Sequence, residues 1–164
     1  MADLQTDERP VGYMERTRLY YRALGYETDY VWSTYDEVPF TQLRQPLTDV
    51  KLALLTTASP PDQSNRDDNG RKHVWSGRIA SPPETFVTDV AWDRESTHTD
   101  DRESFLPIDA ALELAKEGAF AGLTEHFIGV PTDYSQTKTI TSDAPEVLRR
   151  LRDDGADAAV LSPL

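Results

Sequence analysis

The sequence predicts an α/β fold, an open and mostly parallel twisted sheet of about four strands with helices on both faces. Short apolar runs that are typical of strands alternate along the chain with segments of helical periodicity. The clearest of these runs, Val50–Ser59, contains a continuous apolar stretch, as in a strand that is covered on both faces. A length of 164 residues is enough for one domain with a substantial hydrophobic core.

The N-terminal part begins with a polar stretch. Residues 1–12 are expected to form a flexible arm, and residues 13–164 a single α/β domain. Tyr13–Leu24 carries apolar residues at helical spacing and is followed by Gly25, which predicts a helix that ends there. The aromatic segment Tyr26–Asp36 is expected to pack into the core because aromatic side chains bury large areas, with the lining of a pocket as the alternative.

The middle of the chain is expected to supply two strands that are separated by a long connection. Val50–Ser59 should lie in the centre of the sheet. Pro60–Pro83 is rich in Pro, Asp, Asn, Ser and Gly and predicts a loop. Thr85–Trp92 alternates apolar and polar residues and predicts the second strand.

The next segments predict a helix, a strand and a loop. Pro107–Gly118 places its apolar residues on one face, with proline near the start and glycine at the end, which indicates a helix. His126–Val130 is expected to be a short third strand, and Pro131–Ile140, which is rich in Thr and Ser, to be a loop.

The C-terminal part predicts a well-specified helix and a last strand. Asp143 is expected to cap a helix that begins at Ala144 and ends before Gly155. Ala156–Leu164 then predicts the fourth strand, whose apolar centre is similar to that of the first.

Charge and composition exclude several classes of function. The formal charge is -12, from 29 acids and 17 bases, and such a charge repels nucleic acids and anionic membranes. The sequence has neither an apolar run long enough to span a bilayer nor a recognisable targeting peptide, so a cytoplasmic location is expected. The absence of cysteine excludes disulfides, thiolate metal sites and thiol chemistry within these residues. We expect no cofactor.

Candidate ligand-binding residues follow the strands, because open parallel sheets bind ligands beyond the carboxyl ends of their strands. Thr56, Thr57 and Ser59 end the first strand, and Tyr134 follows the third. The hydroxyls are expected either to bind a substrate or to satisfy local backbone groups, and the sequence favours neither.

A second candidate site is the acidic segment that follows Trp92. His98 and Asp100 lie among several other carboxylates, a composition that suits substrate binding, proton transfer or an oxygen-rich metal site. The alternative is a solvated approach to the Pro107 helix, whose N-terminus acidic residues stabilise. His73 and His126 are expected to be surface or structural histidines.

Several segments together resemble one protein family over nearly the whole chain. They are Tyr13–Arg18, Asp36–Thr41, Leu106–Asp109, Gly129–Gln136 and Asp154–Ala158. In these segments the chain is similar to the glycine/betaine/sarcosine/D-proline reductase selenoprotein B family.

This resemblance implies an oxidoreductase component that cleaves a C–N or related bond of a small amino acid or amine. In the family, a selenocysteine or cysteine follows the strand that corresponds to Ala158–Leu161, and electrons come from a dithiol partner. The 164 residues contain no cysteine. We therefore expect a substrate-side domain whose redox thiol or selenol lies on a missing segment or on a partner.

The expected partners are a small amine or amino acid, a dithiol-carrying or other subunit, and a second copy of the chain. Two alternatives remain open. One is a non-catalytic binding or scaffold module with the same fold. The other is a metal-assisted enzyme built around His98.

Overall fold

The computed structural model describes residues 12–164, except for residues 30, 32, 39–40, 89–97 and 134. The chain divides into two compact units, residues 1–39 and residues 40–164, and each is described by itself. Apart from Gly12, the predicted N-terminal arm lies outside the described residues.

The first unit contains the predicted N-terminal helix, α1 (Tyr13–Ala23). Its last turn is closed by two bonds, from Gly25 N–H to the Arg22 carbonyl and from Tyr26 N–H to the Tyr21 carbonyl. Gly25 has a φ of 88°, the left-handed conformation that this type of helix end requires. The predicted end of the helix is therefore confirmed.

The described residues of the aromatic segment that follows α1 do not pack into a core. Tyr26, Val31 and Tyr35 are all exposed, so the prediction of core packing is wrong for these residues. Tyr30 and Trp32 lie outside the described residues. The rings of Tyr21 and Tyr26 meet edge to face with centroids 5.6 Å apart, and Arg22 pairs with Asp29. These contacts are local, because the short unit has too few apolar residues to cover its own rings.

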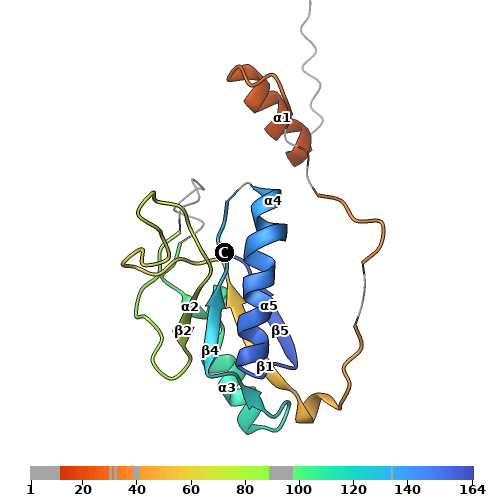
Figure 1. Cartoon of the computed structure of the whole chain (residues 1–164), viewed down its shortest axis with the longest axis vertical. Coiled ribbons are helices and arrows are strands. Elements are labelled where there is room, and N and C mark those ends of the chain that lie inside the picture. Colours follow the sequence, from red (N-terminus) through yellow and green to blue (C-terminus); the bar gives the residue numbers. More distant parts are fainter. Residues whose placement is uncertain (1–11, 30, 32, 39–40, 89–97, 134) are drawn as a thin grey trace, which may run out of the picture. The chain divides into compact units, whose positions relative to one another are not determined.

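The second unit is an open, mostly parallel sheet of five strands, which confirms the predicted fold class (Figure 1). The strands are β1 (Lys51–Thr56), β2 (Trp75–Arg78), β3 (Gly122–Leu123), β4 (His126–Gly129) and β5 (Ala158–Ser162). β1 pairs in parallel with β5 along most of its length. It also pairs in parallel with β3 near its start and with β4 at its end. β2 is antiparallel to β4.

Helices cover both faces of this sheet. They are η1 (Leu47–Asp49), α2 (Arg102–Phe105), α3 (Ile108–Lys116), α4 (Gln136–Lys138), the π-helical turn η2 (Thr139–Asp143) and α5 (Ala144–Asp153). Leu54 and Phe127 point toward the α3 face, where they join a core that includes Ile108 of α3. On the other face Ile128 belongs to a smaller core against which Val147 of α5 packs. This alternation is what a strand buried on both sides produces.

The pairing of β2 with β4 depends on two glycines. A Cβ on Gly129 would overlap the indole of Trp75, and a Cβ on Gly77 would overlap the ring of Phe127. The two rings meet edge to face with centroids 5.3 Å apart, and the Trp75 indole N–H donates to the Ala58 carbonyl at 3.1 Å. The glycines therefore let large aromatic side chains lie directly against the backbone.

The second predicted strand is wrong in position. β2 lies inside Pro60–Pro83, which was expected to be a loop, whereas the described part of Thr85–Trp92 contributes a single bridge between Val87 and Ser59. Residues 89–92 lie outside the described residues. β2 carries one large apolar residue, Trp75, and so lacks an alternation of apolar and polar residues. It forms a strand because it pairs with β4.

The last helical segment begins earlier than predicted. Helical structure starts at Gln136, within the predicted loop Pro131–Ile140, and the Ser135 hydroxyl caps it by accepting from Lys138 N–H. Asp143 is not a cap, because its backbone is helical and its carboxylate binds the Lys138 ammonium. The π-helical turn η2 joins α4 directly to α5, so no new helix end is formed at Asp143.

Four further elements agree with the prediction in kind and in place, whereas α2 and β3 were not predicted. α3, β4, α5 and β5 lie within the segments assigned to them. None of the helices described is both long enough and apolar enough to cross a bilayer.

Candidate functional site

The carboxyl ends of the parallel strands meet at one edge of the sheet. β1, β4 and β5 end at Thr56, Gly129 and Ser162, near α4 and the C-terminus in Figure 1. Trp75 pairs with Gly129, so the antiparallel strand β2 begins at the same edge. This carboxyl edge is where open parallel sheets bind ligands.

The predicted hydroxyls at this edge lie together but already have partners. Thr56 is fully buried and accepts from Ala58 N–H at 3.2 Å. Thr57 accepts from Leu164 N–H at 2.9 Å, and Ser59 accepts from the side-chain amide of Asn65 at 3.3 Å. For the two threonines, these bonds agree with the alternative that the hydroxyls satisfy local backbone groups. Each hydroxyl still keeps one proton that it can donate.

His98 and Asp100 do not join this cluster. The Nδ1 atom of His98 lies 3.7 Å from a carboxylate oxygen of Asp100, and half of the His98 side chain and most of the Asp100 side chain are exposed. The two form a local pair on the surface. Tyr134 lies outside the described residues.

Two acids in the segment around His98 stabilise the starts of helices, which agrees with the alternative that this segment is a solvated approach to a helix. Asp101 accepts from Glu103 N–H at the start of α2. The carboxylate of Glu103 accepts from Asp109 N–H and Ala110 N–H in the first turn of α3. Burial opposes ionisation of Glu103, but these bonds and Arg102 outweigh it and hold its pKa below the usual value.

A hollow of about 580 Å³ lies at the carboxyl edge on the α5 face. One wall is the chain that leads into β2, and the other is η2 and the first turns of α5. The lining residues are His73, Val74, Thr141, Ser142, Asp143, Pro145, Glu146, Arg149 and Arg150. The hollow therefore combines acidic, basic and hydroxyl groups.

The charged groups of this hollow are fixed by ion pairs. Hydrogen bonds from Arg149 and Arg150 lower the pKa of Glu146 to about 2, so Glu146 is ionised at neutral pH. Asp143 is almost fully buried, and both of its oxygens bind the Lys138 ammonium, at 3.0 and 2.8 Å. Burial opposes the charge on Lys138, but Asp143 and Asp133 outweigh it and raise the pKa of Lys138.

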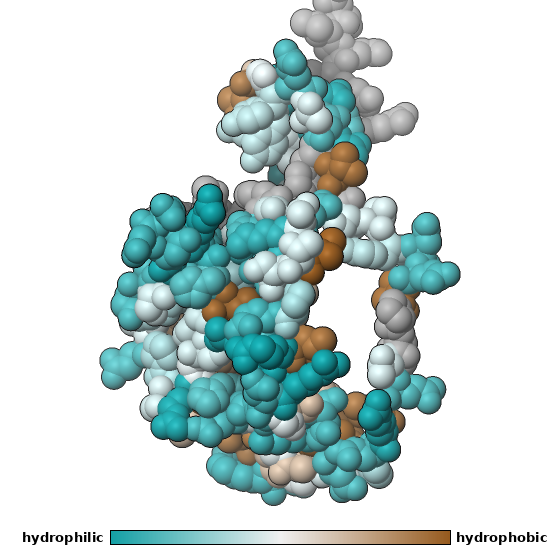
Figure 2. Space-filling model, in the orientation of Figure 1, coloured by the Kyte–Doolittle hydropathy of each residue, from teal (hydrophilic) through white to brown (hydrophobic). Residues whose placement is uncertain are grey.

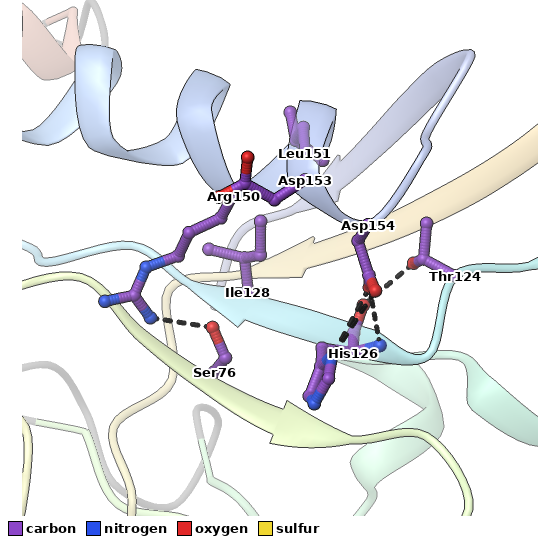
Figure 3. Close-up of a pocket in the computed structure, with 8 residues that line it drawn as sticks. All are labelled: Ser76, Thr124, His126, Ile128, Arg150, Leu151, Asp153 and Asp154. Atoms are coloured by element: carbon purple, nitrogen blue, oxygen red, sulfur yellow. Dashed lines mark hydrogen bonds and ion pairs between the residues drawn. The ribbon is translucent and has the colours of Figure 1, made fainter.

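A second hollow, of about 290 Å³, continues along α5 toward the amino ends of the strands (Figure 3). Arg150 lines both hollows and reaches from α5 to β2, where it donates to the Ser76 hydroxyl at 2.7 Å. His126 and Asp154 face each other at the far end, with His126 Nδ1 3.4 Å from Asp154 Oδ2. Figure 2 shows that the side chains over α5 are largely hydrophilic.

Sequence reasoning missed the residues that line these hollows. His73 and His126 were expected to be surface or structural histidines, and no role in a site was assigned to Glu146 or Arg150. His126 and Asp154 are 28 positions apart, and no local spacing pattern joins them. One signal was available. A helix that follows a parallel strand starts at the carboxyl edge of the sheet, so the start of α5 could be placed at that edge.

Comparisons with known proteins add no relative. No family model, no curated protein and no solved structure matches the chain.

Proposed function

We propose that this chain is the substrate-side domain of a selenoprotein B-type reductase that acts on a small amino acid or amine. The substrate would occupy the hollow between His73 and Glu146 at the carboxyl edge. The redox thiol or selenol would come from outside the 164 residues, since these contain no cysteine. The observation that carries the proposal is a hollow of mixed charge at the edge where parallel sheets bind ligands.

The charges of the hollow suit a zwitterion. Glu146 and Arg149 pair with each other at 2.8 Å, and a bound zwitterion would replace this pair, with its ammonium group on Glu146 and its carboxylate on Arg149. Arg149 is more than half exposed, so it can reorient toward a ligand without breaking a buried contact. A volume of about 580 Å³ admits a small amino acid together with water.

The end of β5 supports the same location for the redox group. Leu164 N–H donates to Thr57, so the backbone leaving β5 runs beside the end of β1 at the carboxyl edge. A thiol or selenol that a further segment or a partner subunit delivers to this edge would meet a substrate bound there. The electrons would come from a dithiol-carrying subunit.

Association with another subunit has a candidate surface in β5. Within the described residues β5 pairs only with β1, and Val160 and Leu161 are exposed on opposite faces of the strand. Exposed apolar strands of this kind favour association. A second copy of the chain or the dithiol subunit is the proposed partner.

A non-catalytic binding module is the second candidate function. It is favoured by the lack of cysteine together with the hydrogen bonds that already occupy Thr56, Thr57 and Ser59. Such a module would bind the same ligands in the same hollow. It would differ in having no turnover when a dithiol and a reductase partner are supplied.

Isothermal titration calorimetry with glycine, sarcosine, betaine and D-proline tests the proposed site. We expect saturable binding of at least one of them and a loss of at least tenfold in affinity, about 1.4 kcal/mol, in R149Q. R152Q is the matched control, because Arg152 is an exposed arginine of α5 that does not line the hollow. Absence of binding by the wild-type chain, or equal affinities for wild type and R149Q, would overturn the proposal.

A further inference from the structure

A histidine and two carboxylates converge at the amino edge of the sheet, away from the proposed substrate site. Glu125, His126 and Asp154 each offer one ligand atom, and these atoms all lie within 4.8 Å of one another. His126 is the first residue of β4, Glu125 precedes it, and Asp154 follows the last residue of α5. The imidazole lies between the two acids, with Nδ1 3.4 Å from Asp154 and Nε2 3.9 Å from Glu125.

The backbone around this cluster is held in place by hydrogen bonds. Asp154 Oδ2 accepts from His126 N–H at 2.8 Å, and the Thr124 hydroxyl donates to the His126 carbonyl at 2.8 Å (Figure 3). The Asp154 carbonyl in turn accepts from the Lys51 ammonium at 2.9 Å. These bonds restrain two of the three residues before any ligand binds, which lowers the entropic cost of binding.

We propose that Glu125, His126 and Asp154 bind a divalent first-row transition metal ion, with Zn²⁺ as the representative case. An imidazole with two carboxylates suits Zn²⁺ or Mn²⁺ better than Ca²⁺ or Mg²⁺, which take oxygen ligands. Ligand atoms in a tetrahedral zinc site stand about 3.3 Å apart. One imidazole nitrogen binds the metal, and the three candidate ligand atoms lie within 4.8 Å of one another, so they must approach by up to about 1.5 Å. Rotation of the exposed Glu125 side chain can supply much of this approach.

The adjoining hollow completes the site. His126 and Asp154 line the hollow of about 290 Å³, which leaves room for the water ligands that three protein ligands require. Two carboxylates also balance the double charge of the ion. The bound metal would tie the start of β4 to the turn between α5 and β5.

Arg78 competes with the metal for Glu125. Its guanidinium binds the Glu125 carboxylate, and about two thirds of the Arg78 side chain is exposed. Because Arg78 is exposed, it can swing away or move to the second carboxylate oxygen when a metal binds. Removal of this cation should therefore strengthen metal binding.

The test is calorimetric titration of the full chain with Zn²⁺, together with the visible absorption of Co²⁺. We expect one equivalent to bind and the affinity to fall at least tenfold in H126Q, E125Q and D154N. R78Q should bind more tightly than wild type. H98A and D153N are matched controls, since His98 lies in the other histidine–carboxylate pair and Asp153 lines the same hollow outside the cluster.

Each outcome bears on the proposal. E125Q changes a side chain that is more than half exposed, so its effect can be read even if H126Q unfolds. The proposed site would be overturned if the chain did not bind Zn²⁺ or if H98A lost binding. It would also be overturned if neither E125Q nor R78Q changed the affinity. Binding of glycine, sarcosine, betaine or D-proline by a chain that binds no Zn²⁺ would overturn this inference alone.

Discussion

The main-chain N–H of Leu164 donates to the hydroxyl of Thr57 across 2.9 Å, which joins the chain leaving β5 to the end of β1. Ser162, the last residue of β5, pairs with Thr56, so this bond continues the link between the two strands beyond their ladder. The bond holds the C-terminal backbone at the carboxyl edge, where we place the substrate.

T57V should weaken this connection. Valine keeps the shape of threonine but cannot accept from Leu164 N–H, so we expect a loss of about 1 kcal/mol in the free energy of unfolding in urea. T48V is the matched control, because the hydroxyl of Thr48 bonds its exposed neighbour Asp49. An equal effect of both substitutions would contradict a specific role for Thr57.

G129A should destabilise the sheet strongly. A methyl group at Gly129 overlaps the Trp75 indole, which would have to move and give up its bond to the Ala58 carbonyl. We expect a loss of about 3 kcal/mol in the free energy of unfolding. G12A, which has open space around its Cβ, should change stability by less than about 0.5 kcal/mol. A G129A protein as stable as wild type would mean that the two side chains do not pack as described.

K138M should leave the Asp143 carboxylate buried without its cation. We expect a loss of about 2 kcal/mol, less than for a fully buried pair because more than a quarter of the Lys138 side chain is exposed. The double variant K138M/D143N should recover part of this loss. K116M, which breaks an exposed pair with Glu113, should have little effect. If the double variant is no more stable than K138M, the buried charge is not the cause.

E103Q should reduce stability in a pH-dependent way. The pKa of Glu103 in the folded chain is below its ordinary value of 4.5, so the ionised carboxylate stabilises the fold above that pH. This contribution is lost as the pH falls below about 4.5 and through the lower pKa of the folded state. Urea unfolding should therefore show E103Q about 1 kcal/mol less stable at pH 7, with the difference shrinking below pH 4.5. A difference that is independent of pH would contradict the role of the charge.

The strands and helices that the sequence identifies are those with a strong apolar pattern. β1 and β5 have continuous apolar centres, and α3 has one apolar face, so each could be placed from the sequence. β2 could not, because its sequence is Trp-Ser-Gly-Arg and its strand character comes from pairing with β4. The early start of the helix at Gln136 was hidden by a threonine-rich segment whose cap is Ser135.

The sequence predicted where the candidate site lies better than it predicted which residues line it. The rule for parallel sheets led to the carboxyl edge and to Thr56, Thr57 and Ser59. The charged lining was missed because His73 precedes a strand that was not predicted, while the charges of Glu146 and Arg149 fit the start and the exposed face of an ordinary helix. Pairs such as His126 with Asp154 require the β4–α5–β5 topology before they can be recognised.

The most direct test of the proposed function is an amide NMR titration of the isotopically labelled chain with glycine, sarcosine, betaine and D-proline. We predict saturable shifts that concentrate at His73, Thr141 and Glu146 around the carboxyl-edge hollow. R149Q should reduce them, while R152Q should leave them unchanged. Shifts that concentrate around His98 and Asp100 instead, or no saturable shift with any of the four ligands, would contradict the account.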